Sequence, residues 1–352
     1  MLFILDRYIR SLIFKTTIVA LFILLTISGI IKFSEKIQSI DNSYISIFYL
    51  ISTILLSVPK DIEEFFNISI LIGILWSIGI LEKNRELIII ESSGISRIKI
   101  CILIIKTIII FLFIYSIILE WIIPIEKKIK SKYFFNFISE NKKNLWIKIN
   151  NNFILIKKIV DFDFIQGIYI YEFNKFNEIK YIKSSKYAIF KNKEWIMFDV
   201  KTIKFNNNKK IEINSFDKQI YTNIITPKEI NLILFPTEEL SISELYFYIK
   251  FLKKNNLYYK KQYLVFWNKI FSPISILIIT IIILQLLFGI LYSYDIKIKV
   301  VFVISLGFIF YFINNIFNSL IMIYDYPEYF GQIMNILFLL IISILSKKFL
   351  YK

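Results

Sequence analysis

Long apolar segments constrain this chain most, because a helix of roughly 20 apolar residues is enough to cross a bilayer. The hydrophobic content is 57% and the mean hydropathy is +0.62, which indicates an integral membrane protein rather than a soluble globule. Six segments are predicted to span the membrane: Ser11–Phe33, Phe65–Leu81, Ile100–Leu119, Tyr263–Leu291, Val300–Ile323 and Gln332–Leu345. Before the second span, Ile45–Val58 predicts a shorter helix with a kink or boundary at Pro59, since a residue before proline disfavours helical geometry.

A charged segment, Glu82–Lys99 (EKNRELIIIESSGISRIK), connects the second and third spans. Because the runs on both sides return into lipid, this segment has to lie at one membrane surface. Its pattern predicts a helix over about residues 84–94, with Asn84 as the N-cap and Gly94 as the stop.

Two interpretations of this helix remain open. A helix of about ten residues is marginal in water by itself, so it needs either the membrane surface or a partner protein to lie on. As a plain connector, it would use its charges only to stay out of lipid. As a docking helix, it would present the exposed apolar patch LIII (Leu87–Ile90), beside Arg85, Glu86 and Glu91.

The polar region from about residue 127 to 261 consists of short runs in which apolar and polar side chains alternate. Such alternation is typical of β-strands. Six strands are predicted: Leu145–Ile149, Phe153–Val160, Ile165–Phe173, Tyr181–Phe190, Glu194–Val200 and Lys210–Phe216. Their regular spacing predicts one sandwich-like all-β domain. Further along, Ser241 and Glu244 predict a capping box at the start of a helix.

Short loops predict the orientation, because basic residues concentrate on the cytoplasmic side. The loop Tyr324–Gly331 carries two acidic residues and no basic one. The β region is long enough to escape this rule. With the N-terminus inside, the charged segment is expected in the cytoplasm and the β region in the periplasm or outside the cell. The short segments on the predicted inside then hold Arg7, Arg10, Lys83, Arg85, Arg97, Lys99, Lys297, Lys299, Lys347 and Lys348.

Several classes of function are disfavoured. Histidine is absent and Cys101 is the single cysteine, so a structural zinc site, a Ser/His/Asp triad and an internal disulfide are not expected. No Gly-x-x-x-x-Gly-Lys-Ser/Thr motif is present, so the chain is not expected to bind ATP through a P-loop. The net charge of +16 comes from scattered lysines in a composition biased toward Ile, Lys and Asn, and it does not indicate nucleic-acid binding.

A few polar residues near or within the spans are candidates for function. Lys32 ends the first span, either as a lysine reaching toward the headgroups or as a contact for a lipid phosphate. Asn314 and Asn318 lie one helical turn apart within the fifth span, and interhelical hydrogen bonding is the favoured interpretation.

Several short motifs together resemble a known family. They are LDRYI near the start, SGIIKF (Ser28–Phe33), LLSVPKD (Leu55–Asp61), REL (Arg85–Leu87), SGISR (Ser93–Arg97), EW (Glu120–Trp121), SISELYFYIKFLK (Ser241–Lys253) and W-x-K-I-F-x-P (Trp267–Pro273). This set, spread almost end to end, resembles the LptF/LptG permeases of the lipopolysaccharide-export ABC transporter. SGIIKF with SVPKD is more similar to the LptG branch of the family.

The resemblance implies a transport permease, not an enzyme, in the bacterial inner membrane. Its partners would be an LptF-type sister permease, two copies of an LptB-type cytoplasmic ATPase and an LptC-type single-span subunit. The complex would extract lipopolysaccharide and pass it to a periplasmic bridge of β-jellyroll domains. No metal or cofactor is expected in this chain, and ATP would be bound by the partner ATPase.

The resemblance also assigns roles to residues. The charged segment corresponds to a coupling helix that sits in a groove of the ATPase, with Glu86 at the coupling glutamate and Arg85, Leu87, Ile90 and Gly94 beside it. Lys32 matches a lysine that contacts the acidic groups of lipopolysaccharide. The chain departs from the family pattern nearby: a basic pair is replaced by Gln38 and Ser39, and arginines after Trp121 are missing. Possible substitutes are Lys36, Lys130 and Lys132.

We therefore expect a polytopic α-helical membrane protein with a 3+3 arrangement of transmembrane helices and an inserted periplasmic jellyroll-like domain. The expected parts are residues 1–126, 127–261 and 262–352. Two alternatives are kept: the sister permease of the LptF branch, and a membrane-anchored scaffold whose β domain binds periplasmic proteins. A scaffold has no need of an ATPase, so copurification with one distinguishes them.

Overall fold

The computed structural model describes residues 2–38, 47–127, 129, 144–149, 152–174, 178–205, 211–221, 225–324 and 326–347. The chain forms two compact units. One unit combines Met1–Glu126 with Tyr263–Lys352, and the other is Lys127–Gln262.

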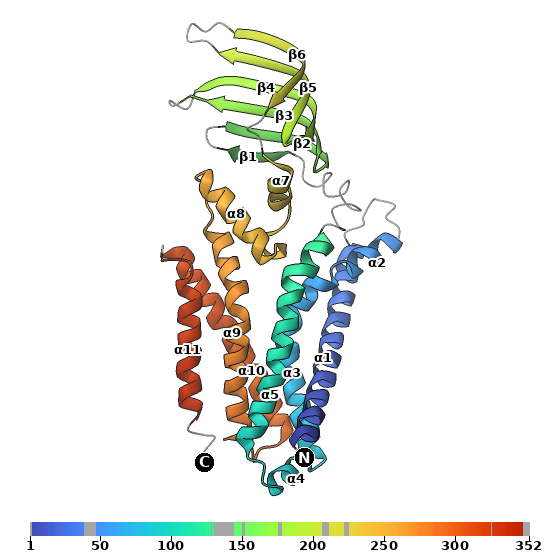
Figure 1. Cartoon of the computed structure of the whole chain (residues 1–352), viewed down its shortest axis with the longest axis vertical. Helices are drawn as coiled ribbons and strands as arrows, with labels where there is room; N and C mark the ends of the chain where they lie inside the picture. Colours follow the sequence, from blue (N-terminus) through green and yellow to red (C-terminus); the bar gives the residue numbers. More distant parts are fainter. Residues whose placement is uncertain are drawn as a thin grey trace. The chain divides into compact units, whose positions relative to one another are not determined.

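The first unit is helical (Figure 1). Among the described residues, six helices are long and apolar enough to cross a membrane, which confirms the prediction of six spans. The helices of this unit are α1 (Leu2–Gln38), α2 (Ile47–Leu55), α3 (Val58–Lys83), α4 (Glu86–Ser92), α5 (Arg97–Ile117) with the π-helical turn η1 (Ile118–Ile122), α9 (Lys260–Phe288), α10 (Ile296–Ile323) and α11 (Phe330–Lys347). The first three residues of α9 precede Tyr263, where the second stretch of this unit begins.

The start of α3 follows the prediction, while α1 is longer than predicted. Helix α3 begins at Val58 with Pro59 in its first turn, where the missing N–H of proline costs no hydrogen bond. Helix α1 extends nine residues before Ser11, starting at Leu2. The polar side chains at that end support the helix, because Arg10 and Asp6 form an i,i+4 ion pair at 2.5 Å.

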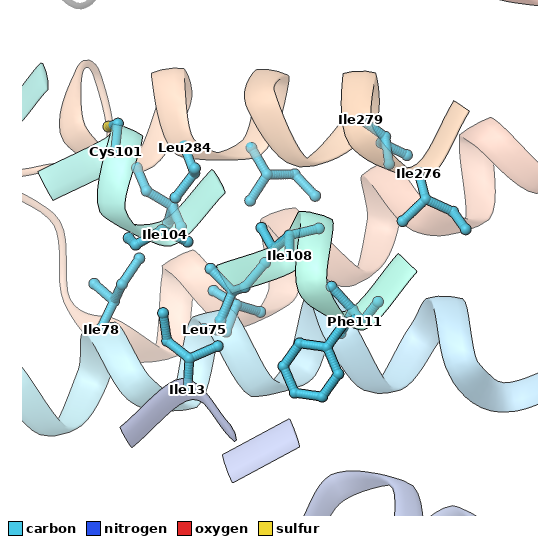
Figure 2. Packing of buried hydrophobic residues seen from close by; sticks show 14 of the residues in the cluster. Ile13, Leu75, Ile78, Cys101, Ile104, Ile108, Phe111, Ile276, Ile279 and Leu284 are labelled. Carbon is cyan, nitrogen blue, oxygen red and sulfur yellow. The ribbon is translucent and has the colours of Figure 1, made fainter. Parts of the chain in front are cut away.

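The core of the helical unit lies around α5 (Figure 2). Ile104, Ile108 and Phe111 of α5 are almost fully buried. Figure 2 shows them between residues of α3, such as Leu75, and residues of α9, such as Ile279. The first and second halves of the chain therefore share one core in this unit.

Helices α1 and α3 approach each other closely at Gly73. The Thr16 hydroxyl donates to the Gly73 carbonyl at 2.8 Å. A Cβ atom on Gly73 would lie 2.7 Å from the Thr17 Cα atom, closer than atoms of two backbones can pack. Glycine at this position therefore permits the close crossing of α1 over α3.

Amide side chains connect α9, α10 and α11. Gln332 Nε2 lies within hydrogen-bonding distance of Asn318 Oδ1 at 2.9 Å, Asn314 Oδ1 at 3.3 Å and Asn268 Oδ1. Asn335 Nδ2 donates to Asn314 Oδ1 at 3.1 Å. The prediction that Asn314 and Asn318 make interhelical hydrogen bonds is thus confirmed.

The second unit contains a sheet of six antiparallel strands. The strands are β1 (Leu145–Ile149), β2 (Asn152–Asp161), β3 (Phe164–Phe173), β4 (Ile179–Lys191), β5 (Glu194–Phe205) and β6 (Ile211–Tyr221). All six predicted strands are present, whereas the predicted sandwich is not confirmed. The described strands pair in chain order, β1-β2-β3-β4-β5-β6, in one sheet. Hairpin connections alone produce this order, whereas a jellyroll needs strands that cross between two sheets, so the jellyroll detail is not confirmed.

Helices follow the sheet in the second unit: α7 (Pro227–Leu234), the 3-10 turn η2 (Thr237–Glu239) and α8 (Ile242–Lys254). The predicted capping box of Ser241 and Glu244 is confirmed at the start of α8. Helix α7 begins with a second capping box, of Thr226 and Glu229, that the sequence analysis missed. Buried Trp195 of β5 donates its indole N–H to the Ile225 carbonyl at 2.6 Å and so holds the start of α7 against the sheet.

Candidate functional site

The charged segment folds as a short helix between two sharp turns. Helix α4 spans Glu86–Ser92 and is therefore shorter than the predicted 84–94. Asn84 caps the end of α3 rather than the start of α4. The N-cap is Arg85, in the left-handed region with φ of 58°, and Gly94 follows the helix with φ of 85°. One change of direction before α4 and another after it let this helix lie across the ends of α3 and α5.

The two faces of α4 differ from the expectation. Leu87 and Ile90, expected to bind a partner, are 2% and 9% exposed and belong to the core of the helical unit. Ile88 and Ile89 are instead 61% and 63% exposed. The sequence LIII therefore divides into an inner pair, which anchors the helix, and an outer pair, which forms an exposed apolar patch. Any partner of α4 meets the outer pair.

Glu86 starts α4 and is held by two neighbours. Its carboxylate accepts a hydrogen bond from the Tyr8 hydroxyl at 2.7 Å and another from the Asn84 amide at 3.0 Å. Tyr8 belongs to the first turns of α1, whose start lies at the same end of the helical unit as α4 (Figure 1). These contacts fix the carboxylate at the side of α4 while leaving Glu86 partly exposed.

A polar cluster ties α4 to the second half of the chain. The Arg97 guanidinium donates to both carboxylate oxygens of Glu91, at 3.0 and 3.4 Å. It also lies over the Tyr292 ring, 3.8 Å from the ring centroid, and Arg97 donates to the Phe288 carbonyl at 3.4 Å. Tyr292 donates its hydroxyl to Glu91 at 3.2 Å. Partial burial, and then the Glu91 carboxylate, raise the pKa of the Tyr292 phenol, so it remains a donor at neutral pH.

A buried lysine extends this cluster to α3 and α10. Lys299 is 2% exposed and donates to Glu82 at 2.6 Å and to the Tyr292 carbonyl at 3.2 Å. Glu82 lies in the last turn of α3, and Lys299 in the first turn of α10. The ends of α3, α4, α5, α9 and α10 are thus joined by charge-assisted hydrogen bonds, which are the strong ones in proteins.

Replacing Arg97 with alanine is expected to loosen α4. The variant removes the bidentate bond to Glu91 and the cation–π contact with Tyr292. Hydrogen exchange of the amides of residues 86–92 should accelerate by about tenfold, the effect of losing about 1.4 kcal/mol of local stability. The control is Arg10→Ala, which removes an arginine ion pair within one helix. If exchange of α4 is equally slow in both variants, the cluster does not hold the helix.

A second polar cluster lies at the other end of α1, near α2 (Figure 1). Lys32 forms an ion pair with Asp61 of α3 and donates to the Ser57 hydroxyl at 3.2 Å. The Ser28 hydroxyl donates to the other Asp61 oxygen at 3.3 Å. The Asp61 side chain is 4% exposed, while that of Lys32 is 30% exposed. Lys32 is therefore neither a plain snorkelling lysine nor an isolated cation.

Of the other residues predicted to contact lipid, the structure places only Lys36 on the same helix as Lys32. Lys36 lies one turn further along α1 and donates to the Thr53 hydroxyl of α2. Lys130 and Lys132 lie outside the described residues. On the other side of α3, Glu63 pairs with Lys269 of α9 at 2.8 Å, with side chains 15% and 7% exposed. The first turns of α3 thus hold α1 through Asp61 and α9 through Glu63.

The partners of these residues were not predicted from the sequence. Asp61 and Arg97 lie within the motifs SVPKD and SGISR, but no contact was predicted for either of them or for Tyr292. Lys32 within the first predicted span and Asp61 just before the second were an available signal, because an isolated charge in lipid is costly and usually paired.

Comparison with known proteins agrees with these features. The family model "Lipopolysaccharide export system permease LptF/LptG" matches residues 7–348. The chain is 31% identical to the lipopolysaccharide export system permease protein LptG of Escherichia coli strain K12 over 339 residues, which cover 94% of each chain. It is also 31% identical to LptG of Haemophilus influenzae over 353 residues, 98% of each chain. The similarity includes both spans that flank α4 and both units of the fold. The chain therefore belongs to the LptF/LptG family of lipopolysaccharide export system permeases.

Proposed function

We propose that this chain is the LptG-type permease subunit of an ABC transporter that extracts lipopolysaccharide from the inner membrane and passes it to a periplasmic bridge. Similarity to LptG proteins along nearly the whole chain carries this proposal. The chain is a transport permease and not an enzyme. ATP is bound and hydrolysed by a separate subunit, and this chain needs no cofactor of its own.

Helix α4 is the proposed contact with the ATPase. Its exposed pair, Ile88 and Ile89, suits an apolar groove, and Glu86 beside it provides a fixed charge. Arg85 provides the turn that precedes α4, and Gly94 provides the turn that follows it. Leu87 and Ile90 transmit the contact inward, because they pack in the core of the helical unit.

The polar cluster around Arg97 determines which helices would move when a partner pushes α4. If α4 were attached only to α3 and α5, those two helices would rock as levers. Glu91, Arg97 and Tyr292 also attach α4 to the α9–α10 connection. We therefore propose that closure of the ATPase pushes α3, α5, α9 and α10 together, and that this movement squeezes the lipid out of a cavity shared with the sister permease.

The proposed partners are an LptF-type sister permease, two copies of an LptB-type ATPase and an LptC-type single-span subunit. The β unit offers a place for the bridge to continue. Strand β6 ends the described sheet and exposes Ile213, Phe216 and Ile220 by 67%, 47% and 56%. An edge strand of this kind accepts a further strand or sheet from another chain.

In the proposed orientation, α4 faces the cytoplasm and the β unit faces the periplasm. The experiment that tests the function is copurification of the chain with a P-loop ATPase, followed by ATP-dependent removal of lipopolysaccharide from proteoliposomes. A membrane-anchored scaffold would bring no ATPase and would remove no lipid, and either result would overturn the proposal.

Removing the Lys32 charge is expected to weaken lipopolysaccharide binding. Lys32→Ala alone would leave the buried Asp61 carboxylate unpaired, which costs several kcal/mol, so Lys32→Ala is combined with Asp61→Asn. A charge-assisted contact is worth about 1.5–3 kcal/mol, so the dissociation constant of lipopolysaccharide for the assembled complex should rise by roughly tenfold or more. Lys15→Ala, an exposed lysine on the same helix, is the control. Equal binding by the two variants would leave Lys32 with no lipid contact.

A further inference from the structure

Asp61 is the only charged group that the described contacts place on Lys32. We propose that Asp61 is an internal counter-ion that competes with the anionic headgroup of the lipid for Lys32, and so keeps the lipid contact weak enough to release. This inference rests on the proposed function, because it assumes that an anionic lipid reaches Lys32.

The exposures of the two side chains determine which of them a lipid can meet. Lys32 is 30% exposed and accessible, while the Asp61 carboxylate is 4% exposed and lies behind it. A phosphate or carboxylate that approaches this end of α1 therefore meets the ammonium group first. The Asp61 carboxylate, in direct contact with the same ammonium, repels that anion and neutralises much of the charge that would attract it.

The hydrogen-bonding capacity of Lys32 also supports competition between Asp61 and a lipid anion. An ammonium group has three N–H donors. One is directed at Asp61 and one at the Ser57 hydroxyl, so an anion with several acceptor oxygens gains a full set of contacts only by drawing Lys32 away from Asp61.

Complete separation of the pair is opposed by the burial of Asp61. Once Lys32 leaves, the Ser28 hydroxyl at 3.3 Å is the one described side-chain partner that the Asp61 carboxylate retains. An uncompensated buried charge is unfavourable. The structure therefore favours the return of Lys32 to Asp61 whenever the lipid moves on. A permease has to pass its lipid to the next subunit, and a contact that is opposed from within is suited to that task.

The first test is Asp61→Asn in the assembled complex. Asparagine keeps the shape and a hydrogen-bond acceptor for Lys32 but removes the competing charge. The dissociation constant of lipopolysaccharide should fall on the order of tenfold, because the apparent affinity rises with the fraction of Lys32 that is free to bind. ATP-driven release should become slower. Weaker or unchanged binding would overturn the proposal, because a residue that merely positions Lys32 gives that result. The control is Glu64→Gln, a carboxylate on the same helix that is 55% exposed.

The second test uses the wild-type complex and avoids any question of folding. An apolar carbodiimide that enters membranes joins a carboxylate to an adjacent amine, and mass spectrometry then measures the Lys32–Asp61 cross-link. Lipopolysaccharide should suppress this cross-link several-fold and leave the Glu63–Lys269 cross-link unchanged, because that buried pair faces α9. A Lys32–Asp61 yield that does not respond to bound lipopolysaccharide would overturn the competition.

Three additions identify the source of the anion: lipopolysaccharide, vesicles of phosphatidylglycerol and inorganic phosphate. Suppression by lipopolysaccharide alone, or by both lipids, supports competition by a lipid headgroup. Suppression by inorganic phosphate at the same phosphate concentration would overturn the assignment to a lipid. Absence of any lipopolysaccharide binding to the wild-type complex would contradict the proposed function itself, which is a different result from binding without loss of the cross-link.

Discussion

Replacing Glu86 with alanine is expected to stop most ATP-driven lipid extraction while the complex remains assembled. Glu86 is a partly exposed charge held at the start of α4, beside the exposed pair Ile88 and Ile89. Its loss removes the contact proposed for it with the ATPase, whereas Leu87 and Ile90 still anchor the helix to the core. Coupling energies between sites are typically about 1–3 kcal/mol, so extraction from proteoliposomes should fall on the order of tenfold to a hundredfold.

A matched variant separates the two contacts of Glu86. Tyr8→Phe removes only the hydroxyl that donates to the carboxylate at 2.7 Å and leaves the charge available to a partner. Its extraction rate should stay within about twofold of the wild-type rate, the effect of a weakened hydrogen bond of less than 1 kcal/mol. Normal extraction by Glu86→Ala would remove the coupling role, and equal loss in both variants would make the bond to Tyr8 the important contact.

Replacing Gly73 with alanine is expected to destabilise the helical unit. The added Cβ atom would lie 2.7 Å from the Thr17 Cα atom, so the crossing of α1 and α3 has to open. Overpacking of this kind costs about 1–3 kcal/mol, and the hydrogen bond from Thr16 to the Gly73 carbonyl is strained as well. The midpoint of thermal unfolding of the purified permease should fall by several degrees.

The control for Gly73 is Gly307→Ala in α10. A Cβ atom there meets no heavy atom closer than 3.9 Å, and alanine favours a helix over glycine by roughly 1 kcal/mol, so stability should stay equal or rise slightly. Adding Thr17→Ala to Gly73→Ala should not restore stability, because the backbone of residue 17 remains in the way. Full recovery in that double variant would show that the contact involves side chains only.

The sequence predicted the elements of the fold well and their pairing less well. The six spans follow from the length of the apolar runs and the six strands from hydrophobic periodicity, and both are local properties. The arrangement of the strands is not local. Regular spacing is compatible with a sandwich and with a single sheet in chain order. The two arrangements differ in which strands pair with each other, and the described strands pair in the order β1-β2-β3-β4-β5-β6.

The candidate sites show the same limit at the level of single residues. Sequence pattern and the family resemblance together identified α4, Glu86 and Lys32 as candidates. It did not reveal that Leu87 and Ile90 face inward, since a short apolar run has no visible inner side until its neighbours are placed. The ion pair of Lys32 with Asp61 joins two helices, and such pairs depend on how helices rotate against each other.

The amide groups that join α9, α10 and α11 bear on how the protein is made. Asn268, Asn314 and Asn318 enter the membrane before Gln332 and Asn335, because α11 is synthesised after α9 and α10. Until α11 arrives, the earlier amides lack the partners that it supplies, and unsatisfied polar groups are unfavourable in hydrocarbon. The polar contacts that join α9, α10 and α11 therefore become complete only after the last span has been synthesised.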